Sequence, residues 1–169
     1  TPKKCTENNE HFSLNMALVC NNGEFSDTLV TTLKNELKIK NLEIGSNNAQ
    51  IEFIKQKLKD EEYILDVKKD KITIKASSDR GIFYGIKTLK QCVNKSTVIG
   101  CHIEDKPDLA IRGVMIDISR SKVPTLKTLK QMVKLFSDLK YNHLELYVEG
   151  FSYEYQSFPE VLVNNKIGR

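Results

Sequence analysis

The sequence has 169 residues, of which 40% are hydrophobic and 28% are charged, so its composition favours a packed core over a disordered chain. The net charge is only +4, and the lysines and arginines are spread along the chain, which argues against a nucleic-acid-binding protein. No apolar run approaches the ~18 residues of a membrane helix, so we expect no membrane span.

The first part of the chain predicts one strand followed by one helix. Residues up to Glu10 are polar and are expected to fray, whereas residues 11–20 contain an apolar run that is typical of a strand. A helix is expected over residues 28–38, because leucines recur there at four-residue steps and so share one face, at Leu29, Leu33 and Leu37. Residues 41–48 are expected to form a loop.

Three further strands are expected over residues 50–56, 63–67 and 71–76, and the sequence KKDK between the last two is typical of a hairpin turn. A helix over residues 80–93 follows. Its two glycines, Gly81 and Gly85, lie four residues apart and predict a face that packs closely on a neighbour. The order β-α-β-β-β-α predicts a small α+β sandwich with helices on one face of an antiparallel or mixed sheet.

Residues 98–103 are interpreted as an extended connector, and the Pro-bearing stretch after it predicts a domain boundary, giving domains 1–108 and 109–169. Residues 112–118 form a continuous apolar strand of the kind buried on both faces. A helix over residues 126–139 is expected to turn an apolar face inward, at Leu126, Leu129, Met132, Val133 and Phe136. A last strand, over residues 143–148, completes a βαβ unit whose strands should be parallel.

One βαβ unit cannot bury a strand that is apolar on both faces. We therefore expect residues 109–169 to be the truncated start of a larger parallel α/β domain. The chain does not begin with Met, so we also expect a processed product or a part of a longer protein. The unpaired strand edges predict self-association of this fragment.

Two stretches together resemble a known family. They are YILDVKKDKITIKASSDRGIFYGIKTLKQ and, after a short connector, IRGVMIDISRSKVPTLKTLKQMVKLFSDLKYNHLELYVE. They are similar to glycoside hydrolase family 20, the β-N-acetylhexosaminidases. The first carries a helix motif, at Ala76, Gly81, Phe83, Tyr84, Gly85, Thr88, Leu89 and Gln91. The second carries a strand motif, at Arg112, Gly113, Met115, Asp117 and Arg120.

The resemblance implies a small α+β domain followed by the first βαβ unit of a (β/α)8 TIM barrel. It implies removal of terminal N-acetylhexosamine from glycans by substrate-assisted retaining hydrolysis, without a metal or cofactor. Active sites of such barrels lie at the carboxyl ends of the strands. By that resemblance Arg120 would bind sugar hydroxyls, Glu149 would line the same pocket, and Asp117 would support Arg120 or a neighbouring strand.

The family's catalytic Asp-Glu pair follows the fourth barrel strand, so we expect no catalytic residue in this chain and no activity from it alone. The expected partners are an N-acetylhexosamine-containing glycan and the remainder of the barrel. The resemblance favours a secreted, lysosomal or periplasmic-type compartment. The motif arginine is followed by Ser121 where many members have His, and the chain has no Trp, so substrate preference stays open.

Each of these interpretations has an alternative. Arg120 could instead be a surface arginine that pairs with Asp117, and Glu149 could lie in a solvated loop. The whole chain could be a non-catalytic packing, assembly or glycan-binding module. Four aromatic residues near the end of the chain could form a sugar-stacking platform, but packing against missing parts of the barrel is the favoured interpretation. They are Phe151, Tyr153, Tyr155 and Phe158.

The cysteines and histidines give little sign of a metal site. None of the cysteine spacings is CxxC, and none of the three histidines lies in an HExxH motif. The cysteines at 20, 92 and 101 lie in apolar contexts typical of buried thiols. A Cys5–Cys20 or Cys92–Cys101 disulfide is the alternative if the protein is exported.

Overall fold

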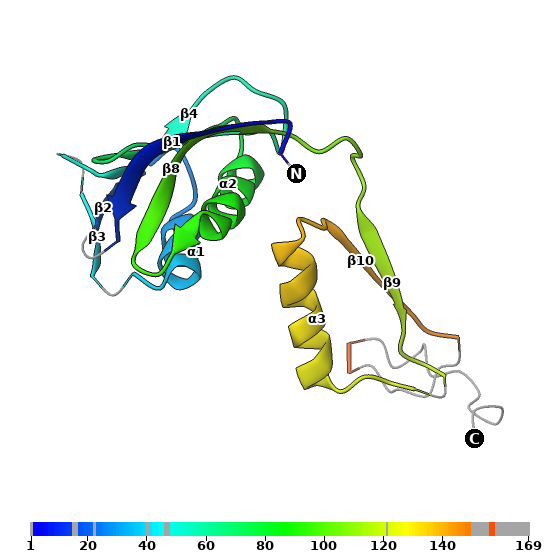
Figure 1. Cartoon of the computed structure of the whole chain (residues 1–169). Coiled ribbons are helices and arrows are strands. Elements are labelled where there is room, and N and C mark those ends of the chain that lie inside the picture. Colours follow the sequence, from blue (N-terminus) through cyan, green and yellow to red (C-terminus); the bar gives the residue numbers. More distant parts are fainter. Residues whose placement is uncertain are drawn as a thin grey trace. The chain divides into compact units, whose positions relative to one another are not determined.

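The computed structural model describes residues 2–14, 17–21, 23–39, 41–45, 48–120, 122–149 and 156–157. The chain divides into two compact units, unit 1 over Thr1–Asp108 and unit 2 over Leu109–Arg169 (Figure 1). In the described part of the chain, no helix is long and apolar enough to cross a membrane.

Unit 1 is built around one mixed sheet. Its elements are β1 (Lys4–Ser13), β2 (Ala17–Cys20), α1 (Thr28–Leu37), β3 (Leu42–Ile44), β4 (Ile51–Lys55), β5 (Tyr63–Val67), β6 (Ile72–Ala76), α2 (Asp79–Gln91), β7 (Val93–Asn94) and β8 (Thr97–Asp105). The strand order is β1-β8-β5-β6-β4-β2-β3, with β7 paired to β8. The pairs from β1 to β6 are antiparallel, and those from β6 to β3 are parallel.

The α+β class and the mixed sheet are confirmed, but the predicted order β-α-β-β-β-α omitted several strands. The expected fraying up to Glu10 is wrong for residues 4–10, because they form most of β1. That strand is almost wholly exposed, so it lacks the apolar alternation by which a strand is usually recognised. Residues 98–103 are not a connector, since β8 lies between β1 and β5 inside the sheet. The expected loop at 41–48 contains β3.

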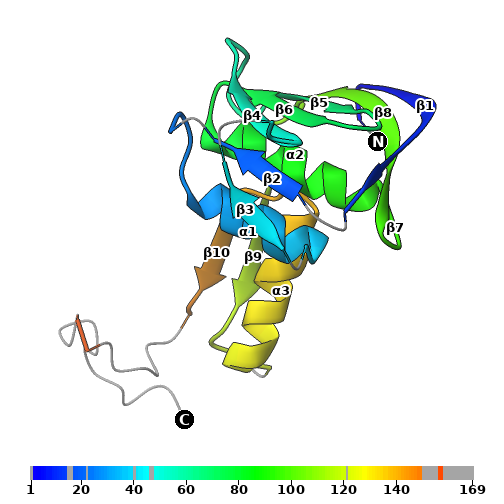
Figure 2. The ribbon, with the colours of Figure 1, turned by 90° about the vertical axis from the view of Figure 1, so that its left-hand side faces the viewer.

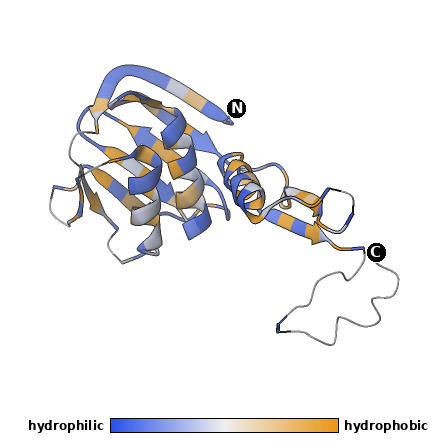
Figure 3. Cartoon of the chain, turned by 90° about the horizontal axis from the view of Figure 1, so that it is seen from below, coloured by the Kyte–Doolittle hydropathy of each residue, from blue (hydrophilic) through white to orange (hydrophobic). Residues whose placement is uncertain are grey.

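Helices α1 and α2 pack below the sheet in Figure 2, and Figure 3 shows them in front of it when unit 1 is seen from below. The strands alternate buried and half-buried residues, as in β5 and β6, so one face of each is in the core. Leu29, Leu33 and Leu37 are all buried, as their spacing predicts. Ser78 caps α2 by accepting a hydrogen bond from the Gly81 amide at 3.3 Å.

The two glycines of α2 allow this helix to lie directly on the sheet. A Cβ added at Gly81 would lie 2.7 Å from the Ala76 Cβ and 2.7 Å from the Glu62 carbonyl oxygen. One added at Gly85 would lie 2.5 Å from the Ile74 Cγ2. The predicted close-packing face is therefore confirmed, and it meets β5 and β6.

The opposite face of the sheet carries a charged cluster around His102. The His102 Nδ1 lies 2.5 Å from the Asp66 Oδ1, and the His102 Nε2 lies 2.9 Å from the Glu104 Oε1. Lys75 approaches Asp66 at 3.5 Å, and Lys4 approaches Glu104 at 2.7 Å. The hydrogen bond to Asp66 is the main cause that raises the pKa of His102 above its ordinary value of 6.5. The same histidine and Lys4 lower the pKa of Glu104 to about 2.

Unit 2 contains β9 (Gly113–Asp117), α3 (Leu126–Asp138) and β10 (His143–Tyr147), and β9 and β10 are parallel as predicted. The beginnings of both strands are held together by Arg112 and Asn142. The Asn142 Oδ1 accepts from the Arg112 amide at 2.9 Å, and the Arg112 Nε donates to the Lys140 carbonyl at 2.9 Å. Thr125 caps α3 through the Thr128 amide at 3.2 Å.

Helix α3 differs from the prediction in its burial. No residue of α3 is fully buried, and Leu126 and Val133, both expected to face inward, are 67% and 47% exposed. Leu129, Met132 and Phe136 are half-buried. The two strands of unit 2 offer too little surface to cover the whole apolar face of α3. The face that was expected to turn inward is therefore only partly covered within unit 2.

The Gly85→Ala substitution should destabilise the protein by ~1–3 kcal/mol, because overpacking a fixed core outweighs the better helix propensity of alanine. Urea unfolding followed by circular dichroism measures this difference. Gln91→Ala, at the exposed end of α2, is the matched control and should be nearly neutral. An equally neutral Gly85→Ala would contradict the close packing.

The His102→Gln substitution should cost most stability at acidic pH. Because the folded pKa of His102 is raised, its contribution is fully present below the unfolded pKa of about 6.5 and is lost as pH rises through the folded pKa. Melting temperatures of wild type and variant between about pH 5.5 and 8.5 should therefore converge as pH rises. In an Asp66→Asn background, the difference in melting temperature caused by His102→Gln should depend much less on pH. If that difference grew with pH in the wild-type background, the raised pKa of His102 would be refuted.

Candidate functional site

The parallel register of β9 and β10 brings Asp117 and Tyr147 side by side at the carboxyl ends of the two strands. Side chains two apart on a strand share a face, so Asp117 lies on the same face as Met115 and Gly113. This face continues on β10 through His143, whose ring lies 3.1 Å from where a Gly113 Cβ would be. The last residues of this face, together with the loops that follow, form the candidate site.

Asp117 organises the loop that follows β9. Its Oδ1 accepts from the Ser119 amide at 2.8 Å, the Ser119 hydroxyl at 2.9 Å and the Arg120 amide at 3.3 Å. Its Oδ2 accepts a short hydrogen bond from the Arg120 Nε. These donors favour the ionised carboxylate, the Ser119 amide most strongly, and they lower the pKa of Asp117 to about 2.

Arg120 lies between two carboxylates and one aromatic ring. Its Nε donates a hydrogen bond to Asp117 and also lies 3.2 Å from the Glu149 Oε2. The guanidinium carbon lies 5.7 Å from the centre of the Tyr147 ring, within the range of a cation–π contact. Asp117, and to a lesser degree Glu149, raise the pKa of Arg120. The arginine is thus held by its Nε edge.

The opposite edge of Arg120 is available to a ligand. The side chain is 63% exposed, and within the described residues its two terminal nitrogens have no hydrogen-bond partner. A planar guanidinium presents its donors in a fixed fork. Such a fork, anchored on one edge and open on the other, can donate to two neighbouring hydroxyl or carboxylate oxygens.

All three residues proposed from the sequence lie in this cluster, but the sequence did not identify two others. The Ser119 hydroxyl accepts a hydrogen bond from the Glu149 amide at 2.7 Å, so Ser119 joins the loop after β9 to the residues after β10. Tyr147 supplies the aromatic ring. The parallel register could have indicated Tyr147, since Asp117 and Tyr147 both end a five-residue strand.

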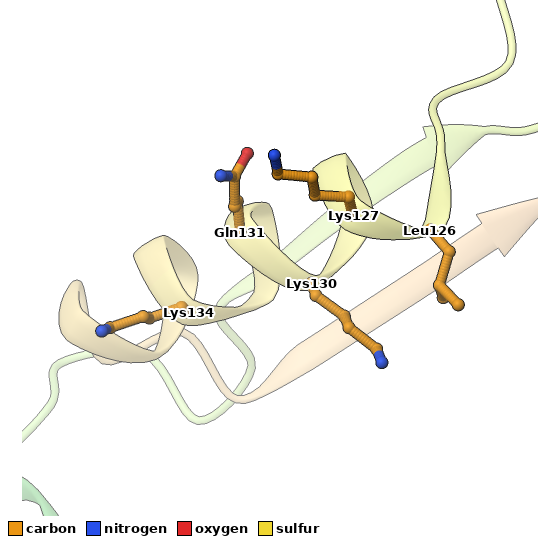
Figure 4. A pocket seen from close by; sticks show the side chains of 5 residues that line it. All are labelled: Leu126, Lys127, Lys130, Gln131 and Lys134. Carbon is orange, nitrogen blue, oxygen red and sulfur yellow. The ribbon is translucent and has the colours of Figure 1, made fainter. Parts of the chain in front are cut away.

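No other candidate feature adds a described residue to this cluster. A group of three histidine, cysteine or acidic residues that could hold a metal is absent among the described residues. A hollow of about 430 Å³ runs along α3 and is lined by Leu126, Lys127, Lys130, Gln131 and Lys134. Figure 4 shows these side chains fanning out from the helix, and none belongs to the cluster around Arg120. The aromatic residues Phe151, Tyr153, Tyr155 and Phe158 lie outside the described residues.

The Ser119→Ala substitution should raise the pKa of Asp117 from about 2 while leaving it below the ordinary value, because the Ser119 amide still donates. Carboxyl-carbon NMR titration of Asp117 measures the shift. Ser137→Ala, on α3, is the control and should leave the titration unchanged. A Ser119→Ala chain that titrates like wild type would show that the hydroxyl does not contact this carboxylate.

The family model "Glycosyl hydrolase family 20, domain 2" matches residues 1–106. A beta-hexosaminidase subunit beta of Entamoeba histolytica is 35% identical over 133 residues, which are 72% of this chain and 23% of that protein. An N,N'-diacetylchitobiase of Vibrio harveyi is 34% identical over 108 residues, 59% of this chain and 12% of that protein.

Solved structures share the fold. An exo-β-N-acetylglucosaminidase of Vibrio harveyi, solved with N-acetylglucosamine, has a TM-score of 0.78 at 23% identity and covers 95% of this chain and 27% of its own. A β-N-acetylhexosaminidase of Streptomyces coelicolor has a TM-score of 0.79 at 22% identity and covers 94% and 36%. The chain spans less than a quarter of the length of the curated relatives named above.

Proposed function

The chain belongs to glycosyl hydrolase family 20, and from this we propose that it is the N-terminal part of a β-N-acetylhexosaminidase. The complete protein would remove terminal N-acetylhexosamine from glycans. Residues 1–108 would be the family's small α+β domain, and residues 109–169 would begin a (β/α)8 catalytic barrel. The names of the relatives, a hexosaminidase and a chitobiase, support the activity.

Unit 2 has the local features of a barrel segment. It is a parallel βαβ unit, the repeating element of such barrels. Several of its large apolar side chains lack cover, with Met115 at 59%, Leu126 at 67% and Leu139 at 60% exposure. In the proposed barrel, Met115 would face the interior, and the remaining strands and helices would cover the others. Alone, these surfaces favour self-association of the fragment.

The observation that carries the proposed binding role is the anchored, half-open guanidinium of Arg120. Asp117 and Glu149 hold its Nε edge at the carboxyl ends of β9 and β10, where barrel enzymes bind substrates. We assign Arg120 to hydrogen bonds with hydroxyls of the terminal sugar. Asp117 is a positioning residue that acts through Arg120, and Glu149 lines the same pocket.

Hydrolysis itself would need residues beyond this chain. In substrate-assisted retention, an enzyme carboxylic acid protonates the leaving oxygen while the acetamido oxygen of the substrate attacks the anomeric carbon. Asp117 does not suit the acid role, because its pKa of about 2 leaves it ionised near neutral pH. The chain therefore supplies sugar contacts, and on its own it is not expected to cleave a glycoside.

Kinetics on the longer protein that contains this chain test the proposal. With a 4-nitrophenyl N-acetyl-β-hexosaminide, Arg120→Ala should lower kcat/KM by about 10–100-fold or more, since each lost charge-assisted hydrogen bond of about 1.5–3 kcal/mol corresponds to a factor of about that size. Arg120→Lys should recover only part of this loss, because an ammonium lacks the planar fork. Arg80→Ala, at an exposed arginine of unit 1, is the control and should retain full activity.

Three results would overturn parts of the proposal. A longer protein without hexosaminidase activity would favour the alternative, a packing, assembly or glycan-binding module. Activity that survives Arg120→Ala unchanged would remove only the binding role of Arg120. Cleavage by residues 1–169 alone would show that the catalytic acid lies within this chain.

A further inference from the structure

Two cysteine sulfurs of unit 1 lie close together although they come from different elements. The Cys92 Sγ, at the C-terminal end of α2, lies 3.9 Å from the Cys101 Sγ on β8. Both residues are thiols in this structure, as is the exposed Cys5 on β1. Cys101 is buried and Cys92 is half-buried. The pair therefore has one sulfur that is partly accessible and one that is enclosed.

An irregularity in the sheet brings the two sulfurs together. In the hairpin formed by β7 and β8, Val93 pairs with Val98, and the Cys92 carbonyl accepts a hydrogen bond from the Ile99 amide at 3.0 Å. Residues three apart on a regular strand point to opposite faces, yet Val98 and Cys101 are both buried. The register between β8 and β1 shifts between these two positions, next to Gly100. The shift turns Cys101 to the side on which α2 ends.

Glycine is needed at the position of that shift. A Cβ at Gly100 would lie 1.9 Å from the Asn8 Oδ1 and 2.7 Å from the Glu10 carbonyl oxygen. The extra residues of β1 therefore fold over Gly100, and this contact fixes the shift. The approach of Cys101 to Cys92 is consequently built into the backbone and does not depend on one side-chain rotamer alone.

We propose that Cys92 and Cys101 are a modification site that closes to an intramolecular disulfide when the protein meets a low-molecular-weight disulfide such as oxidised glutathione. The Cys92 thiolate attacks one glutathione sulfur, forms a mixed disulfide and releases the first glutathione thiolate. The Cys101 thiol then loses its proton as its sulfur attacks the Cys92 sulfur, and the second glutathione leaves as its thiolate. Two protein thiols are oxidised, one disulfide is reduced to two thiols, and the protein thiol protons pass to the released thiolates or to solvent.

The geometry supports this order of attack. Cys92 is the accessible partner, so it meets the oxidant first, whereas the buried Cys101 is placed to resolve the mixed disulfide. The sulfurs need to move from 3.9 Å to the ~2.05 Å of a disulfide bond, a change that side-chain rotation can supply. The hydrogen bond between the two sulfurs also lowers the pKa of Cys92 and raises that of Cys101, so Cys92 is the first of the two to form a thiolate.

The disulfide would join the end of α2 to β8. It would close the β7–β8 hairpin covalently. It would thereby lower the conformational entropy of the unfolded chain more than that of the folded one. Since β8 is the last strand of unit 1, the link would also stabilise the segment from which the chain passes to unit 2. This inference concerns unit 1 and does not depend on the hydrolase activity.

Peptide mapping tests the proposal directly. The 169-residue chain is incubated with oxidised glutathione, its remaining thiols are alkylated, and it is digested with trypsin. Lys95 lies between the two cysteines, so a Cys92–Cys101 disulfide should appear as peptide 91–95 joined to peptide 96–112. The melting temperature should rise by about 5 °C or more on oxidation and fall again with dithiothreitol.

Two variants sharpen the result. Cys5→Ser should keep both the joined peptide and the rise in melting temperature, whereas Cys92→Ser should lose both. The proposal is overturned if glutathione stays on Cys92 as a mixed disulfide, or if the joined peptides contain Cys5 or Cys20 instead. It is also overturned if Cys92→Ser gains the same stability on oxidation.

Discussion

The contact of α2 with β5 and β6 is the constraint on which unit 1 depends. Without side chains at Gly81 and Gly85, the helix backbone lies against Ala76 and Ile74. At that separation the Thr88 hydroxyl lies 2.6 Å from the Tyr63 hydroxyl, which also donates to the Asp105 Oδ2 at 3.0 Å. One buried tyrosine thereby links β5, α2 and the end of β8. Its burial raises the pKa of the phenol, so it remains a neutral donor.

The same helix position fixes a second layer of contacts. Lys87, only 4% exposed, pairs with Glu36 of α1 at 2.5 Å, and Lys90 reaches the same carboxylate at 2.7 Å. Burial alone would raise the pKa of Glu36, but the two lysines lower it. A buried charge pair adds little net stability and strongly disfavours arrangements that separate it. The pair therefore specifies how α1 lies against α2.

The sequence predicted several elements whose periodicity reflects burial, and it missed the edge strand β1, which lacks such a pattern. Leu29, Leu33 and Leu37 revealed α1, and the alternation of β6 revealed a strand, because one face of each is in the core. Edge strand β1 has no such pattern, and its pairing with β8 depends on residues about ninety positions apart. In the candidate site, Asp117, Arg120 and Glu149 followed from a motif and a strand end. The role of Tyr147 follows from the exact register between β9 and β10, and that of Ser119 from its hydrogen bonds to Asp117 and Glu149, neither of which the motif identifies.

The ion pair of Asp117 and Arg120 in the candidate site hardly changes its charge near neutral pH. The pKa of Asp117 is lowered to about 2, and that of Arg120 is raised further above its already basic value. The ion pair and the anchored fork it creates should therefore persist across the range in which glycosidases usually work. If the proposed hexosaminidase loses activity toward either end of that range, the loss does not come from titration of this ion pair. A fixed binding group beside a separately titrating acid is the division of roles that retaining hydrolysis requires, since only the acid has to exchange a proton.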